Sequence, residues 1–317
     1  MRRMFRPAFT AALLLATALS PAWAAEPLRG VALVIGEGEY EALTPLANPE
    51  RDARAMDDLL DDLGFDVTRV LDGDADELRE EIAEFVEDAA DADVALVYYS
   101  GHGVELGGSN YLVPVDAALA SPDEAGRNLV PVDGLLDELA RTVPVTIVLL
   151  DACRTSPFPA GQQFTMPDGR ATLAVDGPGL EATRGPVPVA REGEPAESVG
   201  VVVGFAASPG EVALDGPAGG NSPYAAALLK HLRAGGYEFG DLMTLVSEEV
   251  YLETDARQLP WTNSSLRRFL TFGEALEEVD GDEALIREGR RSLLLTVAET
   301  PASTRMLVEA TAAAEGV

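Results

Sequence analysis

Cysteine and histidine are scarce in this sequence, which has one cysteine, Cys153, and two histidines, His102 and His231, among 317 residues. A single cysteine excludes an internal disulfide, so in an exported protein it is an inert thiol, an intermolecular link or a nucleophile. The inert thiol is the usual state of a free cysteine, because its side chain behaves as a small hydrophobic group. Any thiol chemistry of this chain therefore depends on Cys153.

Positive charge is also scarce, since Lys230 is the only lysine and the formal net charge is −31 at pH 7. This excess of acidic residues argues against nucleic acid or an anionic lipid surface as a partner, because both bind basic surfaces. It favours a soluble protein, and a salty environment suits such a protein because salt screens the self-repulsion.

Long hydrophobic runs are absent after the amino terminus, so the rest of the sequence predicts no membrane span. Three arginines among the first six residues precede the apolar stretch Pro7–Leu19, and Ala22–Ala24 has the small-x-small pattern of a cleavage site. We interpret residues 1–24 as a signal peptide cleaved near Ala24, with a periplasmic or secreted product outside the membrane. An uncleaved anchor is the alternative, although the apolar stretch is short for one. Cleavage would remove the three arginines and change the formal charge from −31 to −34.

Two acidic turns lack residues that ligand-binding loops require. The turn from Gly36 to Tyr40 lacks the third glycine of a dinucleotide-binding loop, and its glutamates would repel a pyrophosphate. The turn from Asp72 to Asp76 resembles the start of a calcium loop, but Glu77 replaces the required glycine and the twelfth position is not glutamate. We therefore expect no nucleotide site, and we interpret the second turn as a solvated cap of the following helix.

Strands and helices alternate along the periodic part of the sequence. Hydrophobic patterns predict strands at Leu28–Ile35, Phe65–Leu71, Val94–Tyr99, Val145–Leu150 and Val201–Ala207. They predict helices at Pro49–Leu63, Leu78–Ala89, Val132–Ala140, Ser222–Leu232 and Phe239–Tyr251, a hairpin at Leu106–Val115 and a loop at Gln258–Ser265. Connections of this size favour an α/β fold, with a mostly parallel sheet and helices on both faces.

Two neighbouring strands end in residues that can do chemistry. Val94–Tyr99 is followed by Ser-Gly-His-Gly with His102, and Val145–Leu150 by Asp-Ala-Cys-Arg with Cys153. Both strand ends are expected at the carboxyl edge of the sheet, where open α/β folds place their sites. A nearby imidazole can take the proton of a thiol, and the backbone N–H groups of Gly103 and Cys153 could form an oxyanion hole for acyl transfer. His231 is expected on the surface of its helix, without a catalytic part.

These two motifs, with the histidine 51 residues before the cysteine, resemble the caspase and metacaspase family of cysteine peptidases, and bacterial exported caspase-like proteins above all. The likeness extends from Leu28 to Phe272. It implies a caspase-like three-layer sandwich with a His102–Cys153 dyad, peptide or protein substrates and no required cofactor. Calcium activates some metacaspases, but no metal site can be assigned by residue here, and oligomeric state is left open.

The resemblance also divides the chain. Residues 28–154 would form a large-subunit region with the dyad and residues 199–273 a small-subunit-like region, joined by a proline- and glycine-rich linker at 155–198 and followed by a helical, acidic extension at 274–317. Caspase relatives often cut between their two halves, so we expect self-cleavage after one of the linker's basic residues, which are Arg170, Arg184 and Arg191.

Substrate preference depends on the residue two positions before the cysteine. Caspases have glutamine there and bind aspartate, whereas metacaspases have aspartate and bind arginine or lysine; this sequence has Asp151. A buried carboxylate pairs with a basic side chain, so we expect cleavage after arginine or lysine. By resemblance Asp52 and Ser100 would also line that pocket, whereas Asp151 read by itself could simply cap a strand end. A catalytically silent caspase-like interaction module is the alternative to the enzyme.

Overall fold

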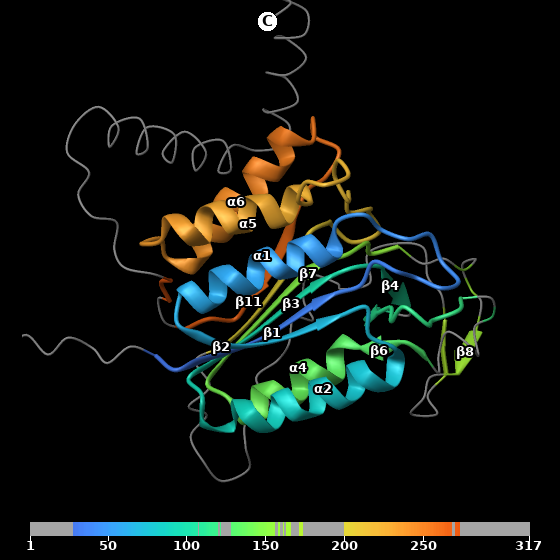
Figure 1. Ribbon diagram of the computed structural model, residues 1–317, viewed down its shortest axis with the longest axis horizontal. Helices are drawn as coiled ribbons and strands as arrows, with labels where there is room; N and C mark the ends of the chain where they lie inside the picture. Colours follow the sequence, from blue (N-terminus) through green and yellow to red (C-terminus); the bar gives the residue numbers. More distant parts are fainter. Residues whose placement is uncertain are drawn as a thin grey trace, which may run out of the picture.

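A six-stranded sheet forms the middle layer of the molecule in the computed structural model (Figure 1). The structure describes residues 28–106, 108–119, 121, 128–155, 158, 161, 163–165, 171–173, 200–267 and 270–272. The strand order is β11-β10-β7-β3-β1-β2, and neighbouring strands are parallel except for the antiparallel pair β10–β11. The strands are β1 (Gly30–Gly36), β2 (Phe65–Leu71), β3 (Val94–Ser100), β7 (Val145–Asp151), β10 (Gly200–Phe205) and β11 (Trp261–Ser264).

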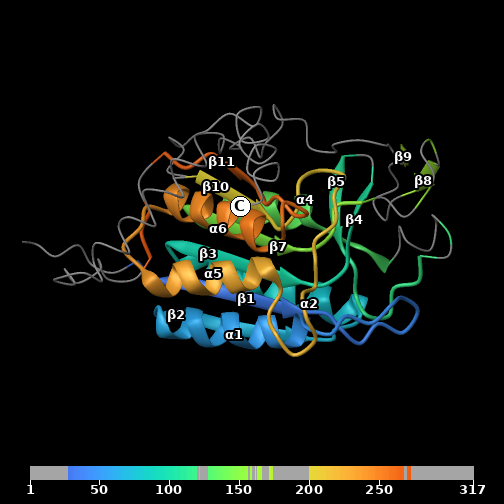
Figure 2. The ribbon, with the colours of Figure 1, turned by 90° about the horizontal axis from the view of Figure 1, so that it is seen from above.

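Helices cover both faces of this sheet, which confirms the predicted three-layer α/β sandwich. Helices α1 (Pro49–Asp62), α5 (Pro223–Ala234) and α6 (Phe239–Glu253) cover one face, and α2 (Ala75–Asp88) and α4 (Val132–Thr142) cover the other (Figures 1 and 2). The short 3-10 helix η1 (Ala89–Asp91) follows α2. Alternate residues of β1, β3 and β7 point to opposite faces and enter two separate apolar cores, so these central strands are buried along their whole length.

The residues that precede helices α2 and α1 use their side chains in different ways. Asp74 accepts hydrogen bonds from the backbone N–H groups of Asp76 and Glu77, so the acidic turn caps α2 as predicted. Asn48 precedes α1, but its side chain makes no cap. The Asn48 amide instead donates to the carbonyl oxygens of Asp215 and Pro217, which attaches the start of α1 to a distant loop.

A smaller antiparallel sheet lies beside the carboxyl ends of the main strands (Figure 2). It consists of β4 (Gly103–Leu106), β5 (Ser109–Leu112) and β6 (Val130–Pro131), and it has its own apolar cluster. The predicted hairpin therefore begins three residues earlier than expected, at the glycine directly after His102. Within the segment predicted as a linker, β8 (Gln163–Thr165) and β9 (Ala171–Leu173) form a two-stranded sheet.

Two predictions for the carboxyl-terminal half are wrong. The expected loop at Gln258–Ser265 contains the edge strand β11. All four of its residues are at least partly exposed, so its sequence, Trp-Thr-Asn-Ser, lacks the alternation of apolar and polar residues that marks a half-buried strand. The structure buries His231, because helix α6 packs against α5 and brings Glu249 to the imidazole, with 2.6 Å between His231 Nε2 and Glu249 Oε2. Neither the edge pairing nor this helix contact leaves a periodic pattern in the sequence.

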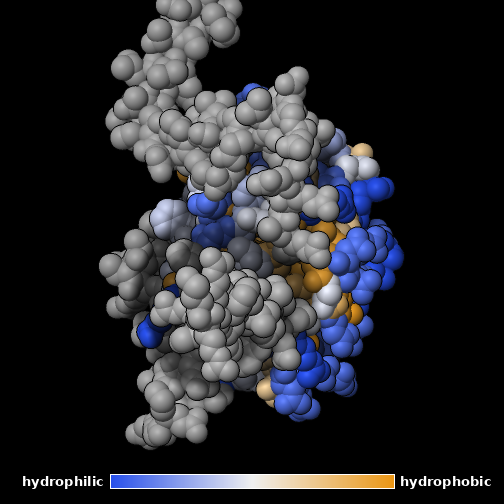
Figure 3. Space-filling model, turned by 90° about the vertical axis from the view of Figure 1, so that its left-hand side faces the viewer, coloured by the Kyte–Doolittle hydropathy of each residue, from blue (hydrophilic) through white to orange (hydrophobic). Residues whose placement is uncertain are grey.

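Figure 3 shows the end of the molecule at which the parallel strands begin, where a hydrophobic area is bordered along the right-hand side of the picture by hydrophilic residues. None of the helices within the described ranges combines the length and the hydropathy that a membrane span needs. The expected signal peptide at 1–24, the candidate cleavage residues Arg170, Arg184 and Arg191, and the extension at 274–317 lie outside the described residues.

Candidate active site

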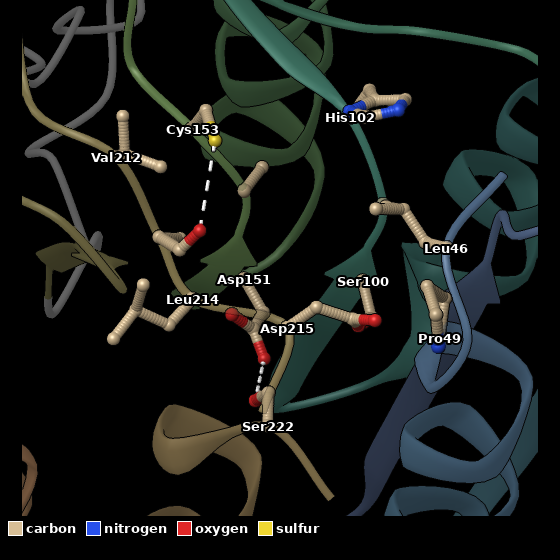
Figure 4. Close-up of a pocket in the computed structure, with 13 residues that line it drawn as sticks. Leu46, Pro49, Ser100, His102, Asp151, Cys153, Val212, Leu214, Asp215 and Ser222 are labelled. Atoms are coloured by element: carbon tan, nitrogen blue, oxygen red, sulfur yellow. Dashed lines mark hydrogen bonds between the residues drawn. The ribbon is translucent and has the colours of Figure 1, made fainter. Parts of the chain in front are cut away.

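The site lies where β3 and β7 end side by side. Ser100 of β3 and Asp151 of β7 are register partners, and His102 and Cys153 each follow two residues later. Both side chains line a single cavity of about 220 Å³. Its lining residues are Leu46, Pro49, Ser100, Gly101, His102, Asp151, Ala152, Cys153, Val212, Ala213, Leu214, Asp215 and Ser222. In Figure 4, His102 and Cys153 lie at one end of this pocket and Asp151 and Ser222 at the other.

The Cys153 thiol is half-buried and donates a hydrogen bond to the carbonyl oxygen of Ala213, with an S to O distance of 3.7 Å. Burial raises the pKa of this thiol, and the nearby Asp151 acts in the same direction. The sulfur is therefore held as a neutral thiol, and it needs a base before it can act as a nucleophile.

The His102 ring is fixed on one side by a backbone carbonyl. Its Nε2 lies 2.8 Å from the carbonyl oxygen of Thr44, and since a carbonyl only accepts, we assign the proton to Nε2. In the neutral ring Nδ1 is then the nitrogen with a free lone pair. His102 and Cys153 thus each bond a main-chain carbonyl here and share no hydrogen bond with each other, although they open into the same pocket.

The backbones expected to form the oxyanion hole approach each other closely. A Cβ atom at Gly103 would lie 2.8 Å from both the Cβ of Ala152 and the carbonyl oxygen of Cys153. Only glycine fits at such a separation without a shift of the backbone. The strand β4 that begins at Gly103 therefore rests directly on the loop that carries the thiol.

The deep end of the pocket is acidic. Asp151 is buried, and its Oδ2 accepts hydrogen bonds from the hydroxyls of Ser222 and Tyr98. Burial, with the charge of Asp52 next in importance, raises the pKa of Asp151 to about 8. Burial therefore favours the protonated form of this carboxyl group.

Asp52 does not line the pocket but is hydrogen-bonded to residues that do. Its Oδ1 accepts from the Asn221 side chain at 2.7 Å and from the backbone N–H of Ser222 at 3.2 Å, and its Oδ2 accepts from the Ser100 hydroxyl at 3.3 Å. Burial raises the pKa of Asp52 to about 6. Of the three residues expected in a specificity pocket, Ser100 and Asp151 line this cavity, and Asp52 lies behind it and accepts a hydrogen bond from Ser100. We call Ser100, Asp52, Asp151 and Ser222 the pocket floor.

Sequence reasoning missed the contribution of the loop after β10. Ala213 accepts a hydrogen bond from the thiol, and Asp215 is the second carboxyl residue, beside Asp151, that lines the pocket. Asp215 is held in place because its Oδ2 accepts a hydrogen bond from the backbone N–H of Ala47, the residue after Leu46, which lines the pocket. Nothing in its sequence neighbourhood marks this residue, since its position depends on a contact 168 residues away along the chain.

The described residues contain no cluster of three or more His, Cys, Asp or Glu side chains that could hold a metal ion. We therefore assign no metal ligand to this site.

Comparison with known proteins finds a family model, two relatives and a solved structure that are similar to this chain. The family model described as the caspase domain matches residues 29–271. The mucosa-associated lymphoid tissue lymphoma translocation protein 1 of Homo sapiens is 34% identical over 125 residues, and its Mus musculus homolog is 33% identical over 125. In both cases the match covers 39% of this chain and only 15% of the relative's length. The crystal structure of caspase-1 from Spodoptera frugiperda superposes with a TM-score of 0.55, at 21% identity, over 80% of this chain and 92% of that one, which supports the fold alone.

Proposed function

This chain belongs to the caspase domain family of cysteine peptidases, and we propose that it is an endopeptidase that uses His102 and Cys153 to cleave after arginine or lysine. The observation that carries the proposal is the pocket itself, which has a thiol and an imidazole at one end and buried carboxyl groups at the other. A cationic side chain at the pocket floor would place the next peptide bond beside the thiol.

The reaction follows from the protonation of the two side chains. His102 Nδ1 accepts the proton of the Cys153 thiol, and the thiolate attacks the carbonyl carbon, so a carbon–sulfur bond forms and the carbonyl π electrons move to oxygen. Backbone N–H groups of Gly103 and Cys153 stabilise that oxyanion. When the carbon–nitrogen bond breaks, the imidazolium gives its proton to the leaving amine. Water activated by His102 then hydrolyses the thioester and restores the thiol.

Ala213 must release the thiol before this can occur. The thiol proton is directed at a main-chain carbonyl, away from the imidazole. A substrate that enters the pocket would contact the same segment, Val212–Leu214. We expect this contact to break the hydrogen bond between the thiol and Ala213, so that the thiol can bond His102 instead. We propose that no metal is needed for the step, so activity should be the same with and without calcium.

A preference for basic residues is supported by the carboxyl groups in and behind the pocket. Asp151 and Asp215 line the cavity, and Asp52 lies directly behind it. These carboxyl groups can pair in their ionised form with a guanidinium through charge-assisted hydrogen bonds, whereas an acidic substrate side chain offers them no positive charge.

The deciding experiment measures hydrolysis of fluorogenic peptides that differ only in the residue before the scissile bond, which is arginine, lysine or aspartate. Wild type should cleave the arginyl and lysyl peptides, whereas Cys153→Ala and His102→Ala should lose this activity. An arginyl chloromethyl ketone should alkylate the Cys153 sulfur with loss of HCl, so that the protein gains the mass of the reagent less HCl, and it should leave the Cys153→Ala variant unmodified. Preference for aspartate would overturn the specificity, and cleavage by Cys153→Ala would overturn the nucleophile.

A silent interaction module is the second candidate, and the observation in its favour is that each dyad side chain is bonded to a backbone carbonyl. It predicts no turnover of any peptide by wild type, with or without calcium, and no labelling of Cys153.

We also propose that the mature protein is exported after cleavage near Ala24 and that the segment between the two halves is cut after Arg170, Arg184 or Arg191. Amino-terminal sequencing of the secreted product tests the first proposal. Peptide mapping of wild type beside Cys153→Ala tests the second, because self-cleavage should stop in the variant.

A further inference from the structure

Two tyrosine hydroxyls bind the backbone of His102 itself. The His102 N–H donates to the Tyr40 hydroxyl at 2.7 Å, and the Tyr99 hydroxyl donates to the His102 carbonyl oxygen at 2.6 Å. Tyr40 follows β1, whereas Tyr99 belongs to β3, so residues from two parts of the chain hold opposite ends of one residue. We call these two hydroxyls and their bonds to His102 the tyrosine clamp.

The clamp is completed by Val113, which follows the hairpin strand β5. The Tyr40 hydroxyl lies 3.2 Å from the Val113 carbonyl oxygen, and the Val113 N–H lies 3.2 Å from the His102 carbonyl oxygen. A hydroxyl has one proton to donate, so the consistent assignment has Tyr99 donating to His102 and Tyr40 donating to Val113. Burial raises the pKa of both tyrosines, so both hydroxyls keep their protons.

The Tyr40 ring contacts the imidazole as well. The two ring centroids are 4.5 Å apart, with 46° between the ring planes. Nε2 is bonded to Thr44 on the Tyr40 loop, so this loop fixes the imidazole through both a ring contact and a hydrogen bond. Main-chain position and side-chain direction of His102 are therefore set by the same segment.

Gly101 shows how closely the clamp fits. A Cβ atom there would lie 2.7 Å from the Tyr99 hydroxyl and 2.8 Å from the Tyr40 hydroxyl. Real Cβ atoms do not approach so closely, so any other residue at 101 would push the clamp apart.

We propose that Tyr40 and Tyr99 are positioning residues for the His102 imidazole, holding it at the distance and angle from Cys153 at which it can take the thiol proton. This proposal rests on the peptidase function proposed above. The two hydroxyls are not equivalent: the His102 carbonyl retains the Val113 N–H when Tyr99 is changed to phenylalanine, whereas Tyr40→Phe removes the partner that the His102 N–H has in the structure. A buried donor left without a partner is the costlier loss, so Tyr40→Phe should have the larger effect.

The first test does not depend on activity. Hydrogen exchange of the His102 amide, followed by NMR in the full-length chain, should be slow in wild type and roughly tenfold faster in Tyr40→Phe, as expected for the loss of one hydrogen bond. Tyr224→Phe is the matched control, because it removes a buried tyrosine hydroxyl that has no hydrogen-bond partner within the described residues. Unchanged exchange in Tyr40→Phe would overturn the clamp.

The second test uses the arginyl peptide. We expect kcat to fall roughly ten- to a hundredfold in Tyr40→Phe and less in Tyr99→Phe, because small displacements of a catalytic group have effects of that size. KM should stay near the wild-type value, since the pocket floor is untouched. The double variant should resemble Tyr40→Phe alone, because both hydroxyls act on one residue.

The outcomes separate the two proposals. Full kcat in both single variants of an active enzyme would overturn the positioning role and leave the peptidase intact. If wild type cleaves no peptide, the peptidase proposal fails, and a positioning role in that reaction fails with it. The amide exchange would still show whether the clamp holds the backbone. The backbone amide of His231, a residue that lies between α5 and α6, serves as an internal reference for the exchange measurement.

Discussion

Ser100 and Asp151 are partners in the register of the adjacent parallel strands β3 and β7. Because both strands run in the same direction, His102 and Cys153, two residues farther along each, leave the sheet at the same level. The partners themselves contribute to the pocket floor. One pairing of two strands therefore sets both the reactive end of the pocket and its acidic end.

Asp151→Asn should abolish most of the preference for basic residues. The substitution keeps the shape of the side chain and removes the charge that a guanidinium would face, so kcat/KM for the arginyl peptide should fall by roughly a hundredfold. The measurement is kcat/KM for arginyl and glutaminyl peptides of the same sequence. Asp58→Asn, an exposed position on α1, is the control and should change neither value. Equal losses for both peptides would show that Asp151 acts on folding and not on specificity.

Binding of an arginyl ligand should strengthen as the pH rises. Asp151 has a pKa near 8 in the empty pocket, and the guanidinium, which keeps its charge throughout this range, requires the ionised carboxylate. Below pH 8 binding must therefore release a proton, so Kd should fall by up to about tenfold per pH unit between pH 6 and 8 and then level off. Calorimetry on Cys153→Ala, which cannot turn the peptide over, measures this directly. A Kd that does not change with pH would mean that Asp151 is already ionised or that the arginyl side chain binds elsewhere.

Stability should decrease between about pH 5 and pH 8. Glu37 is buried, and burial raises its pKa from 4.5 to about 8. In that window the unfolded chain releases a proton that the folded protein retains, so the free energy of unfolding falls as the pH rises, by at most about 1.4 kcal/mol per unit for this group. Urea denaturation of Glu37→Gln should show a shallower slope than wild type. Asp52 and Asp151 act in the same direction, so some slope should persist.

Glu105→Gln should destabilise the protein by about 3–5 kcal/mol, because it leaves the Arg154 guanidinium charged and buried. The two side chains are almost fully buried and form an ion pair at 3.1 Å directly behind the cysteine loop. The matched control is Glu50→Gln, which breaks an exposed pair with Arg54 and should cost less than about 1 kcal/mol. Chemical denaturation of the three proteins compares these costs, and similar values for the two variants would contradict the prediction.

Gly103→Ala should impair the reaction more than the fold. Its Cβ would displace the cysteine loop, where Ala152 and the Cys153 carbonyl oxygen lie within 2.8 Å of it, so kcat/KM should fall at least roughly tenfold. Gly134→Ala is the control, since it adds a Cβ on an exposed turn of α4 with its nearest neighbour at 3.8 Å. That variant should be up to about 1 kcal/mol more stable, because alanine favours the helix. Full activity of Gly103→Ala would contradict the expected displacement.

The sequence predicted best where a pattern repeats over many residues. The buried strands that precede His102 and Cys153 are continuous apolar runs, and the helices show clear periodicity, so the sheet and its layers could be inferred. β11 could not, because a four-residue edge strand needs only the backbone of its neighbour. His231 and Asp215 are placed by contacts between distant segments, which no local pattern records.

The tyrosine clamp could not be predicted from the sequence either. Tyr40 and Tyr99 look like ordinary aromatic residues in the sequence, and their role depends on a loop, a strand and a hairpin that meet at one backbone residue. Glycines 101 and 103 were recognisable beside the histidine, but the contacts that exclude larger side chains there are tertiary.

Strands β7 and β10 are paired in register from Val145–Gly200 to Leu150–Phe205, although 48 residues lie between Asp151 and Gly200 in the chain. A hydrolysed peptide bond between residues 156 and 199 would interrupt the covalent chain and leave this ladder, with both helical layers, in place. Two polypeptides, one ending and the other starting in that interval, should therefore assemble into the same fold when they are produced together. Separately encoded fragments would then allow the activity to be restored by supplying the second fragment.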